Sequence, residues 1–122
     1  MKALDKIADI AVQQEVDLIA LSGDTWDGPI QNTTGSYFPL FVARIRFLAS
    51  MAPVVMIYGT PSHDTEGSLE VFEQVESEYG ITILRPGASY FLSNGKVRSE
   101  WETPGEDELL IYGVPEPSKK WI

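Results

Sequence analysis

Residues Pro53–Asp64, PVVMIYGTPSHD, change abruptly from an apolar run to a polar loop. The run Val54–Tyr58 is short and unbroken, which is typical of a strand that is covered on both faces of a sheet. The Gly, Thr, Pro and Ser that follow favour a loop, and this loop carries His63, the only histidine of the chain. A buried strand that ends in a polar loop is typical of α/β proteins, so this stretch is the first indication of the fold class.

Helical and extended patterns alternate around this strand. Apolar residues recur with helical spacing in three segments, Lys2–Gln14, Tyr37–Ser50 and Leu69–Tyr79. Two further apolar runs, Leu18–Leu21 and Ile81–Leu84, predict buried strands. The third helix is expected to point four carboxylates to water, those of Glu70, Glu73, Glu76 and Glu78. The resulting order α-β-α-β-α-β predicts a parallel sheet with right-handed crossovers.

The last third of the chain has a different pattern. Asn94-Gly95 lies between two apolar runs and predicts a hairpin. A final strand is expected at Leu109–Val114. The predicted fold is therefore α/β, a layered parallel or mixed sheet that is flanked by helices and carries a C-terminal hairpin, in a single domain over residues 1–122.

Composition and charge narrow the classes of function. The 122 residues include no cysteine, which excludes disulfides, thiolate metal sites and a cysteine nucleophile. No apolar run approaches the roughly 20 residues that span a bilayer, so we expect no membrane partner and a cytoplasmic location. The net charge of −9 disfavours non-specific binding to nucleic acid or anionic membranes. The excess carboxylates provide either solubility or cation binding, and charge alone does not decide between these roles.

Two polar loops follow the first two predicted strands. SGDTWDG, residues 22–28, comes after the first strand, and GTPSHD, residues 59–64, comes after the second. Because parallel strands end at the same edge of a sheet and consecutive strands are usually neighbours, we expect four polar side chains to converge there. These are Asp24, Asp27, His63 and Asp64. Gly23 and Gly59 would let the backbone turn sharply and approach a ligand closely.

Carboxylates beside an imidazole suit a divalent cation such as Mn²⁺, Mg²⁺ or Zn²⁺. An aspartate at a strand end can bridge two metals, and two metals about 3.5–4 Å apart can clamp a phosphoryl group. Each residue also has a structural interpretation, because Asp24 and Asp27 suit turns, Asp64 suits a helix cap and His63 suits a solvated loop. The occurrence of both loops at the ends of buried parallel strands favours the functional interpretation.

The stretch DLIALSGDTWDG, followed by PVVMIYGTPSHD, resembles the calcineurin-like metallophosphoesterases. Within them it is most similar to the SbcD-type branch, the catalytic subunit of a DNA double-strand-break repair exonuclease. ELLIYGVPEP, residues 108–117, is similar to the strand that follows the histidine motif in that branch. The resemblance extends from about residue 3 to residue 117 and implies a partial metallophosphoesterase fold.

The resemblance assigns a role to each matching residue. Asp24 corresponds to the metal-bridging aspartate, and His63 corresponds to the general acid that protonates the leaving oxygen, with Asp64 to orient it. Ser62 occupies the place of a metal-binding asparagine, so that Ser62 and Asp64 become further candidate ligands. Gly23, Asp27 and Gly59 complete the two motifs. The implied cofactor is a divalent metal, Mn²⁺, in a two-metal site, and the implied partners are DNA or another phosphodiester and an SbcC-type ATPase.

The chain also departs from the family pattern. The histidine loop is two residues longer, and the family motifs Asp-x-His, before the first helix, and Gly-His-x-His, after the last strand, are absent from this sequence. We therefore expect the chain to be the middle of a nuclease domain. The alternative is a catalytically incomplete α/β fragment that acts as an oligomerising or partner-completed module, with homo-oligomers formed at an exposed strand edge. A third possibility is a phosphoesterase for small phosphate esters, since 9 Lys and Arg face 18 Asp and Glu.

Overall fold

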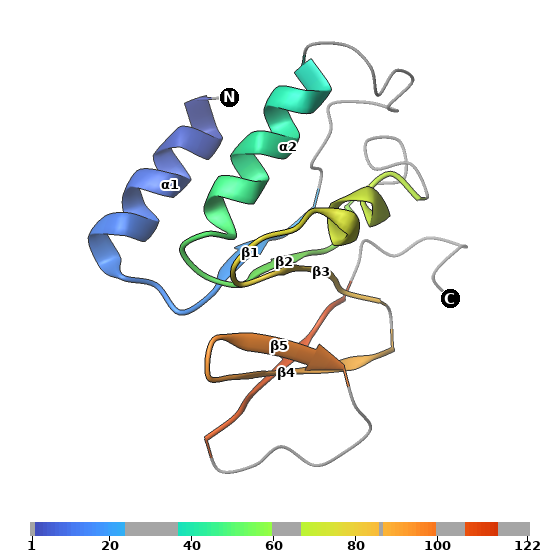
Figure 1. Cartoon of the computed structure of the whole chain (residues 1–122). Helices are drawn as coiled ribbons and strands as arrows, with labels where there is room; N and C mark the ends of the chain where they lie inside the picture. Colours follow the sequence, from blue (N-terminus) through green and yellow to red (C-terminus); the bar gives the residue numbers. More distant parts are fainter. Residues whose placement is uncertain (1, 24–36, 60–66, 86, 100–106, 115–122) are drawn as a thin grey trace.

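The computed structural model describes residues 2–23, 37–59, 67–85, 87–99 and 107–114, and it is of the α/β class (Figure 1). The described helical elements are α1 (Lys2–Gln14), α2 (Tyr37–Leu48) and the short 3₁₀ helix η1 (Glu70–Gln74). The described strands are β1 (Ile19–Leu21), β2 (Val54–Met56), β3 (Ile81–Ile83), β4 (Ser89–Ser93), β5 (Lys96–Ser99) and β6 (Leu109–Tyr112).

The first three strands form a parallel sheet with the order β1-β2-β3. In the register, Val54 lies beside Ile19 on one side and beside Ile81 on the other. The central strand β2 is buried along its whole length, which is the environment that its unbroken apolar run predicts. The predicted parallel sheet is thus confirmed, with strands one or two residues shorter than the apolar runs.

Helices α1 and α2 lie side by side over one face of this sheet, and η1 completes that layer (Figure 1). Val54 and Met56 point into this layer, where α2 contributes Ile45 and Leu48. All four side chains are at most 1% exposed. The largest core of the described chain therefore lies between the helices and the parallel sheet.

The last three strands form an antiparallel sheet with the order β5-β4-β6. Asn94 and Gly95 connect β4 to β5 with φ angles of 51° and 73°, the two positive values that a type I′ hairpin turn requires. This second sheet covers the other face of the parallel sheet, where Val55, Leu84 and Tyr90 form a smaller core. The predicted hairpin and the layered arrangement are both confirmed.

The prediction of a third helix over Leu69–Tyr79 is wrong. Only η1 is helical, and at Val75 the backbone is already extended, with φ −80° and ψ 119°. Beyond it, the Tyr79 amide donates to the Ala49 carbonyl at 3.0 Å, and Arg46 Nε donates to the Glu76 carbonyl at 3.0 Å. These bonds to the end of α2 replace the intrahelical bonds that a longer helix would have made.

The predicted final strand Leu109–Val114 ends at Tyr112 and belongs to the second sheet, where it pairs with β4. Gly113, the next residue, is buried, and a Cβ there would lie 2.9 Å from Cβ of Leu84 and 3.1 Å from Cδ1 of Ile57. The chain after β6 therefore passes close to the ends of β2 and β3. Among the helices of the described residues, none is long and apolar enough to cross a membrane.

Candidate functional site

All three strands of the parallel sheet end at one edge, which we call the carboxyl edge. The Ile57 amide donates to the Leu21 carbonyl at 3.2 Å, and the Leu84 amide donates to the Met56 carbonyl at 2.8 Å. These bonds keep the residues that follow β1, β2 and β3 side by side. The described starts of both predicted polar loops lie at this edge, because residues 22–23 follow β1 and residues 57–59 follow β2.

The origins of the two loops touch through a pair of glycines. Gly23 has φ +108°, and a Cβ on it would lie 2.9 Å from Cα and 3.2 Å from the nitrogen of Gly59. A separation this short leaves no room for a side chain, so the two backbones approach as closely as only glycine permits. The ends of β1 and β2 are therefore neighbours, as the parallel topology predicted. The candidate residues Asp24, Asp27, Ser62, His63 and Asp64 lie outside the described residues.

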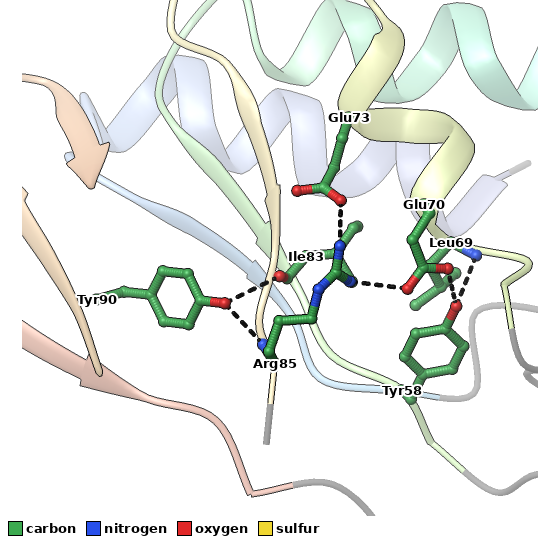
Figure 2. A network of polar contacts seen from close by, with 7 residues as sticks. All are labelled: Tyr58, Leu69, Glu70, Glu73, Ile83, Arg85 and Tyr90. Atoms are coloured by element: carbon green, nitrogen blue, oxygen red, sulfur yellow. Dashed lines mark hydrogen bonds and ion pairs between the residues drawn. The ribbon is translucent and has the colours of Figure 1, made fainter. Parts of the chain in front are cut away.

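Tyr58 joins the two sides of the histidine loop at its base. Its side chain is buried, and its hydroxyl donates to Oε2 of Glu70 and accepts from the Leu69 amide at 3.2 Å (Figure 2). Tyr58 precedes the loop, whereas Leu69 and Glu70 follow it at 11 and 12 positions along the chain. The Tyr58 hydroxyl therefore joins the residue that precedes the histidine loop to Leu69 and Glu70, which follow it.

Arg85 connects this junction to the third strand and to the second sheet. Its Nη1 lies 2.7 Å from Oε1 of Glu70, and its Nη2 lies 2.7 Å from Oε1 of Glu73 (Figure 2). Its backbone amide donates to the Tyr90 hydroxyl at 2.8 Å, and that hydroxyl donates to the Ile83 carbonyl at 3.3 Å. We call Tyr58, Glu70, Glu73, Arg85 and Tyr90 the edge network.

Sequence reasoning missed the edge network. It assigned Tyr58 only to a strand and predicted that Glu70 and Glu73 point to water. Both side chains are partly exposed, at 38% and 31%, and both also bind Arg85, a contact that the sequence did not predict. One signal was present, since a tyrosine that ends a buried strand needs a hydrogen-bond partner for its hydroxyl. Nothing in the sequence identified that partner, because it lies on a different element.

The network shifts two ionisation equilibria. Burial raises the pKa of Tyr58 to about 12, and the hydrogen bond to the Glu70 carboxylate adds to the rise. Burial opposes the charged form of Arg85, but the adjacent Glu73 and Glu70 carboxylates outweigh it and raise the pKa of the guanidinium above its ordinary value. At neutral pH Tyr58 is therefore an uncharged phenol, and Arg85 is a cation.

We expect the buried phenol to make the protein lose stability in strong alkali. Because the pKa of Tyr58 rises from 10.0 to about 12 on folding, the folded state holds this proton more tightly. The stabilisation is complete below pH 10 and is lost between about pH 10 and 12. Urea unfolding at pH 8 and at pH 11.5 should show a smaller alkaline loss in Tyr58→Phe than in the wild type. An equal loss in both proteins would contradict the assignment.

An open hollow of about 360 Å³ lies elsewhere on the protein, near the start of β1 and the tip of the hairpin. The residues that line it include Asp17, Ser93, Asn94 and Asp107. Asp17 precedes β1, so this hollow is at the opposite end of that strand from Gly23. It therefore takes no part in the carboxyl-edge arrangement.

The donor atoms that could hold a metal differ between the described residues and the candidate ligands. Within the part of the chain that the structure describes, no group of three or more His, Cys, Asp or Glu side chains could hold a metal ion. The candidate ligands Asp24, Ser62 and Asp64 all offer oxygen, the donor that Mg²⁺ and Mn²⁺ prefer. By its chemistry the candidate set therefore suits a hard divalent cation.

Two comparisons with known proteins add no relative. A scan against protein-family models finds no match. A search of curated proteins likewise finds no match.

Proposed function

We propose that this chain is a metal-dependent phosphoesterase of the calcineurin-like, SbcD type, which hydrolyses phosphodiester bonds. One observation carries the proposal, the contact between Gly23 and Gly59 at the carboxyl edge. It brings the residue before Asp24 next to the residue that opens the histidine loop. Two sequence motifs that are 39 positions apart, counted from Asp24 to His63, thereby start from one point.

Each candidate residue has a role in this proposal. Asp24 holds a divalent metal, Mn²⁺ in the first instance, with Ser62 and Asp64 as further oxygen donors. When bound, the metal would supply a Lewis acid for the phosphoryl oxygen and a source of hydroxide at neutral pH. His63 donates a proton to the leaving oxygen, and the neighbouring Asp64 orients the imidazole.

The charge of the chain bears on which phosphodiester substrate it can bind. With 18 acidic and 9 basic residues, the chain offers few cations for long contacts with a DNA backbone. The broader proposal is therefore that the chain hydrolyses phosphodiester bonds, with no particular substrate named. The narrower proposal is that it is a DNA exonuclease that acts together with an SbcC-type ATPase.

A metal titration tests the proposal. After treatment with EDTA and dialysis, the protein should hydrolyse bis(p-nitrophenyl) phosphate only when Mn²⁺ is added back. The rate should saturate below millimolar Mn²⁺, and calorimetry should detect binding over the same range. Absence of both binding and hydrolysis in a protein that circular dichroism shows to be folded would contradict the proposal.

The second candidate is a non-catalytic module that is completed by another copy of the chain. Strand β6 favours it, because four large apolar side chains on and after this edge strand are 50–74% exposed. These are Leu109, Leu110, Tyr112 and Val114. The stretch 109–114 carries no charge, so two copies of an acidic chain would repel each other least there. The metal titration separates the candidates, since the module requires no metal.

A further inference from the structure

The two outer strands of the second sheet differ in charge. In the order β5-β4-β6, strand β5 carries Lys96 and Arg98 among its four residues, whereas β6 carries no charged residue. Charged side chains on an outer strand hinder other strands from pairing with it, and a neutral apolar outer strand lacks that protection. Strand β6 is therefore the side of this sheet on which a further strand can be added.

Strand β6 is also open to a partner. Leu109, Leu110 and Tyr112 are each at least 50% exposed. Among the strands that the structure describes, β6 pairs only with β4, so its backbone groups on the other side have no described strand as neighbour. A row of backbone N–H and C=O groups is matched by another extended chain. The partner that fits β6 is therefore a strand.

A second copy of the chain provides such a strand. The net charge of −9 makes two copies repel each other, and this repulsion is weakest where the contact carries no charge, as in the stretch 109–114. Two identical strands can pair antiparallel around a twofold axis, which forms a closed dimer. Residues that lie opposite each other in an antiparallel pair share a face of the sheet, so the apolar side chains of β6 would meet each other.

We propose that β6 pairs antiparallel with β6 of a second copy, so that the two three-stranded sheets join into one sheet of six strands. The twofold axis passes beside Leu110 or Ile111, in the middle of the strand. This pairing gives the second candidate function a strand direction and a symmetry. It does not depend on phosphodiester hydrolysis, because β6 lies in the second sheet.

Sedimentation velocity without added metal tests the pairing, from about 1 µM to about 300 µM protein, a range that covers weak association. We expect the wild type to pass from monomer to dimer. Tyr112→Lys should raise the Kd of the dimer at least about tenfold, because it brings two like charges into an apolar contact. Ser99→Lys is the matched control, since Ser99 is exposed on β5 and the variant has the same net charge as Tyr112→Lys. It should keep the wild-type Kd.

Single cysteines test the geometry, because the chain has none of its own. Opposite residues of an antiparallel pair have Cα atoms about 4.5–5.5 Å apart, within the range that a disulfide spans. Under mild oxidation, Leu110→Cys or Ile111→Cys should therefore form a disulfide between two copies. Ser99→Cys on β5 should remain uncrosslinked.

Three outcomes would overturn the pairing. The wild type could remain a monomer over the whole range, Tyr112→Lys and Ser99→Lys could weaken the dimer equally, or neither cysteine on β6 could crosslink. If circular dichroism shows that Tyr112→Lys does not fold, Leu110→Lys and the cysteine variants still decide. Metal-dependent hydrolysis by a strict monomer would contradict the pairing alone, whereas a dimer without metal binding or hydrolysis would contradict the proposed phosphoesterase alone.

Discussion

Asp24→Asn should abolish Mn²⁺-dependent phosphodiester hydrolysis while leaving the midpoint of urea unfolding close to that of the wild type. The amide keeps the shape of the side chain but removes the negative charge that offsets the metal. The loss should exceed about 100-fold, since residues that merely orient a metal ligand already contribute 10- to 100-fold. Initial rates across a Mn²⁺ titration, with bis(p-nitrophenyl) phosphate and with a DNA oligonucleotide, provide the measurement.

His63→Gln is the variant to compare with it. A p-nitrophenolate leaves without a proton, whereas the alkoxide that departs from DNA needs one. His63→Gln should therefore lose on the order of 10²–10⁴-fold on DNA and much less on the aryl ester. Asp24→Asn should lose activity on both substrates alike. Hydrolysis that survives Asp24→Asn unchanged would show that the activity does not come from the carboxyl edge.

The architecture could be predicted because the strands have a simple pattern. Val54, Val55 and Met56 are all buried, with alternate side chains facing the helices and the second sheet. A strand covered on both faces has no polar side, and an unbroken apolar run records that fact in the sequence. The hairpin was equally readable, because Asn94 and Gly95 tolerate the positive φ angles of its turn.

The third helix was wrongly predicted because its pattern is amphipathic but its surroundings offer better bonds. Helical spacing continues to Tyr79, yet the amide of Tyr79 donates to Ala49, which lies at the end of α2. Arg46 of α2 likewise donates to the Glu76 carbonyl. Both bonds come from residues that are distant in sequence, so local periodicity cannot reveal them.

The part of the candidate site that the structure describes, the neighbouring ends of β1 and β2, could be predicted from the sequence. Parallel topology alone predicts that the ends of β1 and β2 are neighbours, and the approach of Gly23 to Gly59 confirms it. The side-chain contacts of Tyr58 with Glu70 and of Glu70 with Arg85 join the ends of β2 and β3 to η1. No sequence motif predicts these contacts. Such contacts depend on how loops return to the sheet, which strand and helix periodicities do not determine.

Gly23→Ala should destabilise the fold by about 2–5 kcal/mol. The φ angle of +108° is unfavourable for any residue with a Cβ, at about 1–2 kcal/mol. The added methyl would also lie 2.9 Å from Cα of Gly59, and overpacking costs about 1–3 kcal/mol more. The obstacle is backbone, which cannot rotate away as a side chain would. Urea unfolding with a constant m-value measures the loss.

Gly80→Ala separates the two costs. Gly80 has φ +83°, but a Cβ there would meet nothing within 4 Å, so it carries the conformational cost without the clash. The loss in free energy of unfolding should therefore be about 1–3 kcal/mol larger for Gly23→Ala than for Gly80→Ala. Equal losses would contradict the close approach of Gly23 to Gly59. Only Gly23→Ala forces the origins of the two polar loops apart, so it should also lower Mn²⁺-dependent kcat, whereas folded Gly80→Ala keeps the wild-type rate. A Gly23→Ala protein that is destabilised but fully active would separate the glycine contact from catalysis.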